Sequence, residues 1–380
     1  MSTPLPTRGF DWPAGWTPRA RSAFRRALVR WFDSHQRDLP WRTSRDPYRI
    51  WVSEVMLQQT TVTAVVPYFE RFLTAFPTVH DLAAADEPTV LKLWEGLGYY
   101  RRARHLHATA KQLVLNHAGT FPNDPVIGSE FPGVGRYILG AVLSQAFDRK
   151  LPIVEANTLR VLSRLFGYEG DPRTGPGLKW VWSAAEALLP EKRIGDFNQA
   201  MMELGALVCT PTVPDCGSCP AARVCEANRL GQQATIPPPA KRPKVVQVSE
   251  VAVAIWNAGK LLLVQRPADA PRWANMWELP HGEMQNGEVV EDAATRIITD
   301  LTGLQVSLGS EVLTVKHGVT RFAITLICLE ATRAGGRFRS AYYTESRWVN
   351  VSELGVFPLS TPQRKLVTEL ARRGRQQRLF

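Results

Sequence analysis

The sequence has little that would place the protein in or across a membrane. No apolar run in its 380 residues is long enough to span a bilayer. The first residues, MSTPLPTRGFDWPAGW, lack the apolar core of a signal peptide. We therefore expect a cytoplasmic protein with no membrane partner. Acidic side chains are also in deficit, 35 against 46 Lys and Arg, which gives a net charge of +11. This balance suits a polyanion, and nucleic acid is the first candidate.

No internal repeat is evident, and the sequence pattern changes once along the chain. From Arg19 to about Gly205, apolar residues recur at spacings of three and four in AFRRALVRWF, TVLKLWEGLGYY, ILGAVLSQAF and LRVLSRLFG, which predicts helices. The stretch GQQATIPPPAKRPK has no apolar period and is rich in proline and lysine, which predicts an interdomain linker.

Beyond the linker, β-type patterns appear. SEVAVAIWNAGKLLLVQR predicts two strands joined by a turn at 257–259, and TRFAITLICLEA predicts another strand. EVVEDAATRIITDLTG and TPQRKLVTELARRG predict helices. We expect a mostly α domain over residues 1–230, a linker over 231–247 and a smaller α+β domain over 248–380.

Cysteine is scarce, and its distribution is uneven. Four of the 5 cysteines lie in CTPTVPDCGSCPAARVC, at Cys209, Cys216, Cys219 and Cys225. Disulfides are not expected in a reducing cytosol, so thiolates this close together predict a metal site. Structural zinc sites commonly use two Cys-x-x-Cys knuckles, and this loop has one, whereas four thiolates also suit a [4Fe–4S] cluster. The spacing leaves the metal open. Cys328, in a predicted strand, is expected to be a core residue.

The stretch WVSEVMLQQT holds one carboxylate in an apolar setting. In a helix, Ile50, Glu54 and Leu57 share one stripe. A Glu at the edge of the stripe reaches water and has no special role. A buried Glu favours its neutral form and can serve as a proton donor near working pH. The stretch alone leaves both readings open.

The segment FPGVGRYILGAVLS places two glycines just before an amphipathic helix. Gly133 and Gly135 allow a tight turn and a close approach to a ligand. The helix N-terminus beyond them presents free N–H groups that suit an anion. An isolated PGVG is more often a plain helix–turn–helix corner. With a basic chain and a metal loop, a grip on DNA phosphate is the better interpretation.

These features together resemble the helix–hairpin–helix DNA glycosylases that carry an iron–sulfur cluster. Within that group, LPWR, WVSEVMLQQT, GLGYYRRARHLH and FNQAMMELGALVC resemble the adenine DNA glycosylases (MutY family) from about Leu39 to Cys225. The C-terminal half resembles that family's Nudix-like domain. The resemblance implies a [4Fe–4S] cluster in the 209–225 loop and excision of adenine mispaired with 8-oxoguanine or guanine in double-stranded DNA. It further implies a monomer that is nucleoid-associated when bound to DNA.

The resemblance also implies which side chains act on the sugar and base. Glu54 matches the family's proton donor, because a departing purine must be protonated. The second carboxylate belongs to an Asp-Gly-Asn pattern, and this chain has Glu155, Ala156 and Asn157 there. Asn157 matches the Asn that hydrogen-bonds near the sugar. Because a displacement of about 1 Å can cost a large factor in rate, the effect of the longer Glu155 arm is open. The alternative is an inactive descendant in which Glu155 is a surface or capping residue.

Tyr137 stands where bifunctional relatives carry a lysine. A lysine there forms a Schiff base with the sugar and cuts the strand, which tyrosine cannot do. The resemblance therefore implies a monofunctional glycosylase, in which the Tyr137 hydroxyl orders the active site.

Five further positions match residues that the family places against DNA. Trp41 and Arg42 would line the adenine pocket, and Gln199 would read the base edge. Gln59 and Tyr99 would wedge into the duplex around the lesion. Plain packing or a solvated side chain is the alternative for each.

The C-terminal half departs from the Nudix pattern where metal would be held. Ile297 and Leu301 stand where Glu is required, and only Asp300 is acidic, so pyrophosphate hydrolysis is not expected. We expect instead a domain that recognises 8-oxoguanine.

The recognition loop of that half departs from the family as well. The family usually has Phe-Ser-His there, and this chain has Val319, Thr320 and Arg321. Thr320 keeps a hydroxyl for the purine. His317 is a candidate substitute reader, although a lone His at the end of a strand more often has no special role. The preference for the opposite base is therefore open.

Two other functions stay open at this point. One is a related helix–hairpin–helix glycosylase with a different base preference, and the other is a catalytically silent lesion-binding protein.

Overall fold

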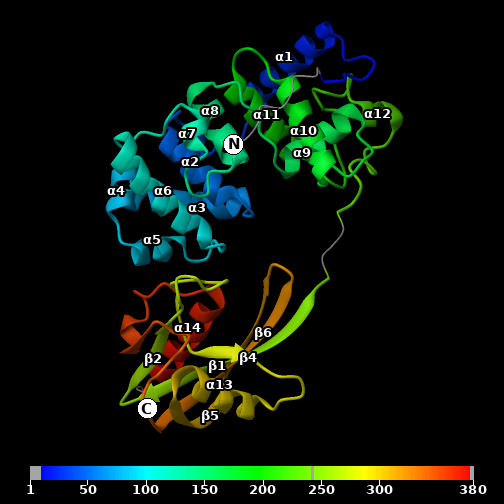
Figure 1. Cartoon of the computed structure of the whole chain (residues 1–380). Helices are drawn as coiled ribbons and strands as arrows, with labels where there is room; N and C mark the ends of the chain where they lie inside the picture. Colours follow the sequence, from blue (N-terminus) through cyan, green and yellow to red (C-terminus); the bar gives the residue numbers. More distant parts are fainter. Residues whose placement is uncertain (1–9, 241–243, 377–380) are drawn as a thin grey trace. The chain divides into compact units, whose positions relative to one another are not determined.

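The protein consists of two compact units. The computed structural model describes residues 10–240 and 244–376. The first unit comprises Met1–Ala83 and Ala108–Lys241, and the second comprises Ala84–His107 and Arg242–Phe380. The first is helical, and the second is built around a seven-stranded sheet among the described residues (Figure 1). The expected fold class, a mostly α part followed by an α+β part, is confirmed.

The chain is helical up to the end of the cysteine region. The elements before the sheet are α1 (Pro18–His35), η1 (Pro40–Arg42, a 3-10 helix), α2 (Pro47–Leu57), α3 (Val62–Ala75), α4 (Val79–Ala84), α5 (Glu87–Trp94), α6 (Arg101–His117), α7 (Pro125–Gly128), α8 (Arg136–Phe147), α9 (Ala156–Phe166), α10 (Gly175–Leu188), α11 (Ile194–Leu207) and α12 (Glu226–Leu230).

Several of these helices start with the same local chemistry. Thr17, Asp46 and Asp124 each cap a helix by accepting a hydrogen bond from a backbone N–H of the first turn. A proline follows each of them, and its fixed φ and missing N–H suit the first helical position. The sequence therefore sets where α1, α2 and α7 begin.

Two groups of helices pack to form the first unit. Helix α11 packs against α1, α8 and α9, and α2 packs against α8 and α3. Phe24, Leu28, Phe197 and Leu204 are among the buried side chains of the core that α1, α9, α10 and α11 share. Because α8 contacts both α2 and α11, residues on these three helices come close together.

The helix predicted from TVLKLWEGLGYY is shorter than expected. Helix α5 ends at Trp94, and the chain continues through Gly96 and Gly98 with φ of 104° and 71°. Side chains other than glycine rarely adopt these values, and they break the helical hydrogen-bond pattern.

The proline-rich segment differs from the linker expected over 231–247. Ile236 is 3% exposed, and its carbonyl accepts a hydrogen bond from Arg164 Nε at 2.8 Å. The carbonyl of Pro238 accepts from Arg173 Nη2 at 2.5 Å. The first part of this segment therefore packs on the helical unit. Residues 241–243 lie outside the described residues.

Residues 84–107 group with the second unit, unlike the expected domain limit at 230. Within that unit, Glu95 forms an ion pair with Arg364, with Arg364 Nε 2.5 Å from Glu95 Oε1. No local sequence pattern predicts an ion pair between segments that are so far apart in the chain. The domain limits proposed from composition alone remain a prediction.

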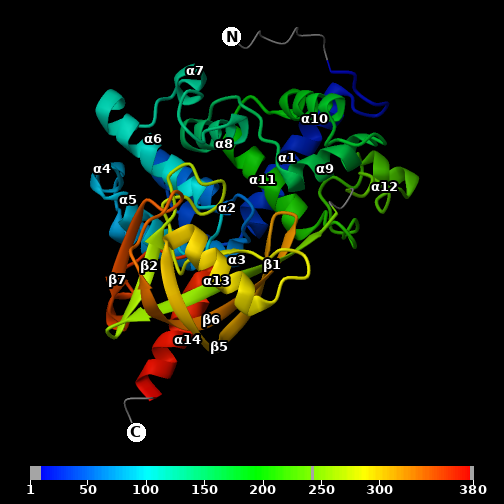
Figure 2. The same ribbon diagram turned by 60° about the horizontal axis from the view of Figure 1, so that its bottom comes forward.

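The second unit is a mixed sheet with a helix on each face. Its strands and helices are β1 (Val246–Asn257), β2 (Lys260–Gln265), β3 (Trp277–Glu278), β4 (His281–Glu283), α13 (Val290–Thr302), β5 (Leu304–Val319), β6 (Phe322–Gly336), β7 (Glu345–Val349), η2 (Val351–Glu353) and α14 (Thr361–Gln376). The main order is β3-β2-β1-β6-β5, with β1 and β6 parallel. Helices α13 and α14 bury their apolar residues against opposite faces of the sheet (Figure 2).

Side chains of α13 and β6 contribute to the core of the second unit. Ile297 is 2% exposed in the core beneath α13, and Leu301 packs partly buried beside it. Glu288, just before α13, pairs with Arg296 on that helix at 2.7 Å. Cys328 is fully buried in β6, as expected for a core residue.

A buried polar cluster lies on the sheet of the second unit. Glu278 is 1% exposed and accepts hydrogen bonds from Arg266 Nη1 at 3.1 Å and from the Tyr343 hydroxyl at 3.0 Å. His281 lies 3.3 Å from the same carboxylate. Burial opposes ionisation, but the charges of His281 and Arg266 offset it and lower the pKa of Glu278.

Within the described residues, no helix combines the length and apolar character that crossing a membrane requires.

Candidate active site and cysteine loop

Glu54 is buried between two helices. It lies on α2, is 3% exposed, and receives two hydrogen bonds from side chains of α8. The Tyr137 hydroxyl lies 2.5 Å from Oε2, and Gln145 Nε2 donates to Oε1 at 2.9 Å. The reading in which Glu54 reaches water at the edge of a stripe is therefore wrong. Its partners come from α8, since none exists in its own stretch.

The surroundings of Glu54 favour a proton on it. Burial raises its pKa, and the hydrogen bonds from Tyr137 and Gln145 and the charge of Arg42 only partly oppose this rise. Burial and the charge of Glu54 raise the pKa of Tyr137 well above its usual value, so the tyrosine keeps its hydroxyl proton. The pair can therefore hold and pass a proton at a carboxyl that is almost completely buried.

Glu155 caps the helix α9. Its two carboxylate oxygens accept from the backbone N–H groups of Asn157 and Thr158, each at 2.8 Å, while the Thr158 hydroxyl accepts from the Glu155 N–H. Burial and the charge of Glu54 raise its pKa, against the opposing effect of these bonds and of Arg160. Glu155 is thus a capping residue, as one of the two interpretations of the sequence expected. Its carboxylate is also close enough to Glu54 for the charge of Glu54 to raise its pKa.

Asn157 and the cysteine loop share one partner, Arg160. Arg160 Nη2 donates to Asn157 Oδ1 at 2.9 Å and to the Gly205 carbonyl at 2.8 Å, and Arg160 Nε donates to the Cys209 carbonyl at 2.8 Å. One guanidinium therefore holds the start of α9, the end of α11 and the first cysteine in place.

A second charged group lies between η1 and α11. Glu203, 1% exposed, pairs with Arg37 at 2.7 Å and with Arg42 at 2.9 Å. Arg42 Nε also donates to Gln199 Oε1 at 3.2 Å. Burial would raise the pKa of Glu203, but the bonds from the two arginines outweigh it and lower the pKa to about 2. Arg42 and Gln199, both predicted for the adenine pocket, are thus brought together.

Three residues of the Glu54 and Glu203 clusters were not found from the sequence. Gln145 occupies a helical run with no feature that marks it. Glu203 is a lone acid in the apolar stretch MMELG, which is the same signal that drew attention to Glu54. Arg37, its ion-pair partner, has no such mark.

Three other predicted residues are placed as follows. Trp41 is 6% exposed, and its ring packs edge-on against Phe69 at 5.4 Å between centroids. Gln59 and Tyr99 are exposed and adopt left-handed backbone conformations, with φ of 59° and 47°. Strained backbone of this kind often occurs at functional positions. The DNA roles of these residues remain predictions.

The two hairpin glycines differ in what they require. Gly133 has φ of 76°, a conformation that other residues rarely adopt. Gly135 caps α8 with an ordinary φ of −79°, and a Cβ added there would meet no atom within 4 Å. The backbone before α8 is thus open to a ligand, as the anion-binding interpretation requires.

The four cysteines of the 209–225 loop are free thiols that lie close enough for their charges to interact. Burial and the neighbouring thiols raise the pKa of Cys219 to about 12 and that of Cys225 to about 11. A bound cation would reverse this effect, because it stabilises thiolates. Within residues 10–240 and 244–376, no group of three or more His, Cys, Asp or Glu side chains forms a ready-made site for an ion.

Donors reach two of these sulfurs. Arg164 Nη1 lies 3.4 Å from Cys209 Sγ, and Gln233 Nε2 lies 3.6 Å from Cys216 Sγ. Hydrogen bonds to sulfur stabilise thiolate ligands and tune the metal group that they hold. A set of four thiols with such donors fits an iron–sulfur cluster.

Two family models match the chain. Residues 52–176 match the HhH-GPD superfamily of base excision DNA repair proteins, and residues 251–369 match the NUDIX domain. An adenine DNA glycosylase from Buchnera aphidicola subsp. Schizaphis graminum is 32% identical over 259 residues, which cover 68% of this chain and 74% of that protein. The chain belongs to the adenine DNA glycosylase family.

Other members match over shorter stretches. Adenine DNA glycosylase from Rattus norvegicus is 44% identical over 221 residues, which cover 56% of this chain and 43% of that protein. The match therefore spans less than half of the rat protein's length. A solved structure of a thermostable thymine-DNA glycosylase is 29% identical with a TM-score of 0.51, and the match covers 56% of this chain and 98% of that one.

The loop in which this family member lacks Phe-Ser-His is the tip of the β5–β6 hairpin. Val319 pairs with Phe322, so Thr320 and Arg321 form a two-residue turn. Thr320 is exposed with φ of 53°, and its hydroxyl donates to the Val319 carbonyl at 2.7 Å. Two residues before Val319 in β5, both ring nitrogens of His317 are buried without a hydrogen-bond partner.

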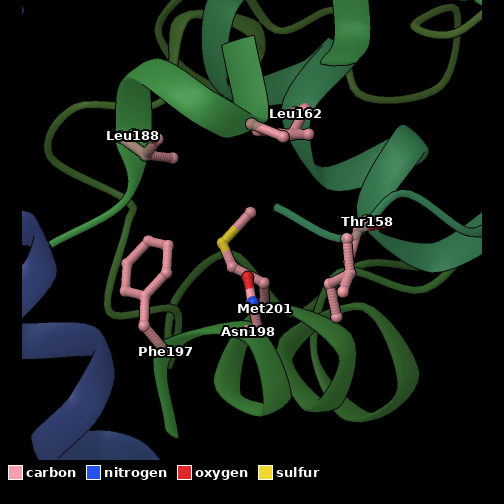
Figure 3. A pocket seen from close by; sticks show the side chains of 8 residues that line it. Thr158, Leu162, Leu188, Phe197, Asn198 and Met201 are labelled. Atoms are coloured by element: carbon pink, nitrogen blue, oxygen red, sulfur yellow. The ribbon is translucent and has the colours of Figure 1, made fainter. Parts of the chain in front are cut away.

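A small cavity in the helical unit lies apart from the Glu54 cluster. It is lined by Ile153, Thr158, Leu162, Ala185, Leu188, Phe197, Asn198 and Met201. The Met201 side chain extends into it between Leu162 and Leu188 (Figure 3). Its volume of about 10 Å³ is too small for a nucleobase. It is a packing defect of the core that α9, α10 and α11 share.

Proposed function

We propose that this protein is a monofunctional DNA glycosylase that removes adenine mispaired with 8-oxoguanine or guanine in double-stranded DNA, as a monomer. Family membership supports the glycosylase class. The observation that carries the proposal is Glu54, a buried carboxyl whose pKa is raised and whose two oxygens are held by Tyr137 and Gln145.

The reaction follows from what such a carboxyl can do. The target adenine is first flipped out of the duplex. Protonated Glu54 gives its proton to a ring nitrogen of the base, the bond from the base to the sugar C1′ breaks, and its electron pair leaves with adenine. The sugar becomes oxocarbenium-like, and water adds at C1′. Tyr137 forms no Schiff base, so the strand is not cut.

Glu155 is proposed as the second carboxylate, stabilising the positive sugar. The charge of Glu54 raises the pKa of Glu155, so the two carboxyls are close enough to interact, which supports this role. Its helix cap favours the second candidate, a lesion-binding protein without catalysis, because both oxygens are already engaged. A related glycosylase with another base preference is the third candidate. Asn157, held by Arg160, is proposed to hydrogen-bond near the sugar.

The remaining residues are proposed to hold DNA. Trp41, Arg42 and Gln199 would line the adenine pocket, and the contact between Arg42 and Gln199 supports this. In addition, Gly133 and Gly135 would approach phosphate, Gln59 and Tyr99 would wedge into the duplex, and Thr320 would meet the opposite base.

The four cysteines of the 209–225 loop are proposed to bind a [4Fe–4S] cluster. Bound there, the cluster would tie the four cysteines into one rigid loop, while Arg160 and Arg164 hold its first cysteine. A broad visible absorbance band in the purified protein with four irons per chain is expected. A colourless preparation loaded with zinc would contradict it.

The decisive experiment is single-turnover release of adenine from duplexes that carry adenine opposite 8-oxoguanine, guanine or thymine. We expect fast release opposite 8-oxoguanine and guanine, with no strand cleavage before alkali. Tight binding without release from any of the duplexes would favour the lesion-binding protein.

The matched control is Glu54→Gln, which keeps the shape of the side chain and removes its acidic proton. Release should fall to background while duplex binding persists. Release that is unaffected by the substitution would exclude Glu54 as the proton donor.

A further inference from the structure

Helix α8 contributes two polar side chains, Tyr137 and Gln145, that donate hydrogen bonds to Glu54. The proposed reaction gives a role to Tyr137 and none to Gln145. Tyr137 lies in its first turn, and Gln145 lies near its end. Both reach across the packed interface between α8 and α2. Gln145 is 9% exposed, so its amide stands in the same dry environment as the carboxyl.

The two donors differ in what they allow. An amide nitrogen can only donate, so Glu54 Oε1, 2.9 Å from Gln145 Nε2, must act as an acceptor. A tyrosine hydroxyl can donate and accept. Its oxygen lies 2.5 Å from Glu54 Oε2 and 3.7 Å from Met202 Sδ. When Oε2 carries the proton, Tyr137 can accept from it and turn its own hydrogen toward the sulfur, which is a weak acceptor.

We propose that Gln145 is a positioning residue that keeps the transferable proton of Glu54 on Oε2, the oxygen that faces Tyr137. A proton on Oε1 would point at the hydrogens of the Gln145 amide and is disfavoured. The carboxyl is therefore held in one orientation and in one protonation pattern before the base arrives. This role rests on the glycosylase activity proposed above.

The same bond sets how readily the proton leaves. A donor to the ionised carboxylate favours that form, so Gln145 limits the rise in pKa that burial causes. The other ionisable groups that act on Glu54 or feel its charge are Tyr137 on α8, Arg42 on η1 and Glu155 at the start of α9. None of these is altered when Gln145 alone is changed.

The test is the pH dependence of single-turnover adenine release in Gln145→Met, which keeps the length of the side chain and removes its hydrogen-bonding groups. Release requires protonated Glu54, so its rate falls as pH rises through the pKa of that group. Without Gln145 the ionised form loses a hydrogen bond, and this limb should move up by about one to two pH units. The matched control, Gln112→Met on α6, should leave the limb in place.

The direction of the shift decides the proposal. An upward shift supports it. An unchanged limb would mean that Gln145 only packs, even if the rate falls at every pH. A downward shift would mean that the amide accepts a hydrogen bond from Oε1, and it would overturn the assignment of the proton.

A second measurement separates this role from the glycosylase activity. The infrared carbonyl band of protonated Glu54, identified by its loss in Glu54→Gln, can be titrated in the unliganded protein. The band should persist to higher pH in Gln145→Met than in the wild type, and equal titrations would overturn the proposal. A wild-type protein that releases no adenine would refute the proposed activity, while the infrared titration would still decide the role of Gln145.

Discussion

Replacing Glu203 by Gln would measure how much one buried charge stabilises the helical unit. Glu203 is 1% exposed and accepts from Arg37 Nε at 2.9 Å, from Arg37 Nη2 at 2.7 Å and from Arg42 Nη2 at 2.9 Å. Glutamine keeps the shape of the side chain but loses the charge. Arg42, whose side chain is 12% exposed, and the half-buried Arg37 would then lack a counter-charge, and the free energy of unfolding should fall.

The size of this effect follows from the pKa. Burial raises the pKa of Glu203, but the bonds from Arg37 and Arg42 outweigh it, and the pKa falls from 4.5 to about 2. This difference corresponds to about 3 kcal/mol of folding stability. Because the pKa is lowered on folding, the stability is fully present above pH 4.5 and is lost as pH falls toward 2.

Urea unfolding of the wild type and Glu203→Gln, followed by tryptophan fluorescence, would check this at pH 7 and pH 4. We expect a difference of about 3 kcal/mol at pH 7 that is about 1 kcal/mol smaller at pH 4, where the unfolded chain already binds protons. The control Glu191→Gln, whose exposed side chain pairs with Lys150, should change stability little. A difference that does not vary with pH would refute the electrostatic reasoning.

Three further substitutions test other parts of the molecule. Glu155→Ala should slow adenine release about a hundredfold or more and lower stability by about 1 kcal/mol, since α9 loses its cap, and an intact release rate would exclude Glu155 from the reaction. Gly133→Ala should cost about 1–2 kcal/mol in urea unfolding because its φ is 76°, whereas equal costs for it and Gly135→Ala would contradict the strain argument. Glu278→Ala should destabilise the second unit by about 3–5 kcal/mol in thermal unfolding, because Arg266 is left buried without its partner, and a loss under 1 kcal/mol would show that water replaces the pair.

The helices and strands that the sequence predicted best are those whose buried residues recur with a regular period. The strands around the 257–259 turn and the helices over 290–302 and 361–376 appear close to their expected limits. The burial of Cys328 could also be predicted from the pattern. These features are local, so the residues that determine them stand next to one another in the chain.

The residues that contact Glu54 and Glu203 are not marked by any periodic pattern in the sequence. Gln145 is 91 residues from Glu54, and Arg37 is 166 from Glu203. The first pair meets because α2 packs against α8, and the second meets because α1, which ends just before Arg37, packs against α11. The burial of Ile236 by distant helical residues gave a proline-rich segment a structured first half that composition cannot reveal. The periodicity of apolar residues does not predict contacts between side chains that are far apart in the sequence.

The β5–β6 hairpin separates the chemistry of its tip from the stability of the sheet. Its two strands pair along nearly their whole length, whereas Thr320 and Arg321 pack against no core cluster of the second unit. Substitutions at the tip should therefore change the stability of the sheet little. Residues there can be replaced, including by Phe-Ser-His, at little cost to the fold. With the tip against the opposite base, as proposed, such replacements would change the base preference while the architecture stays fixed.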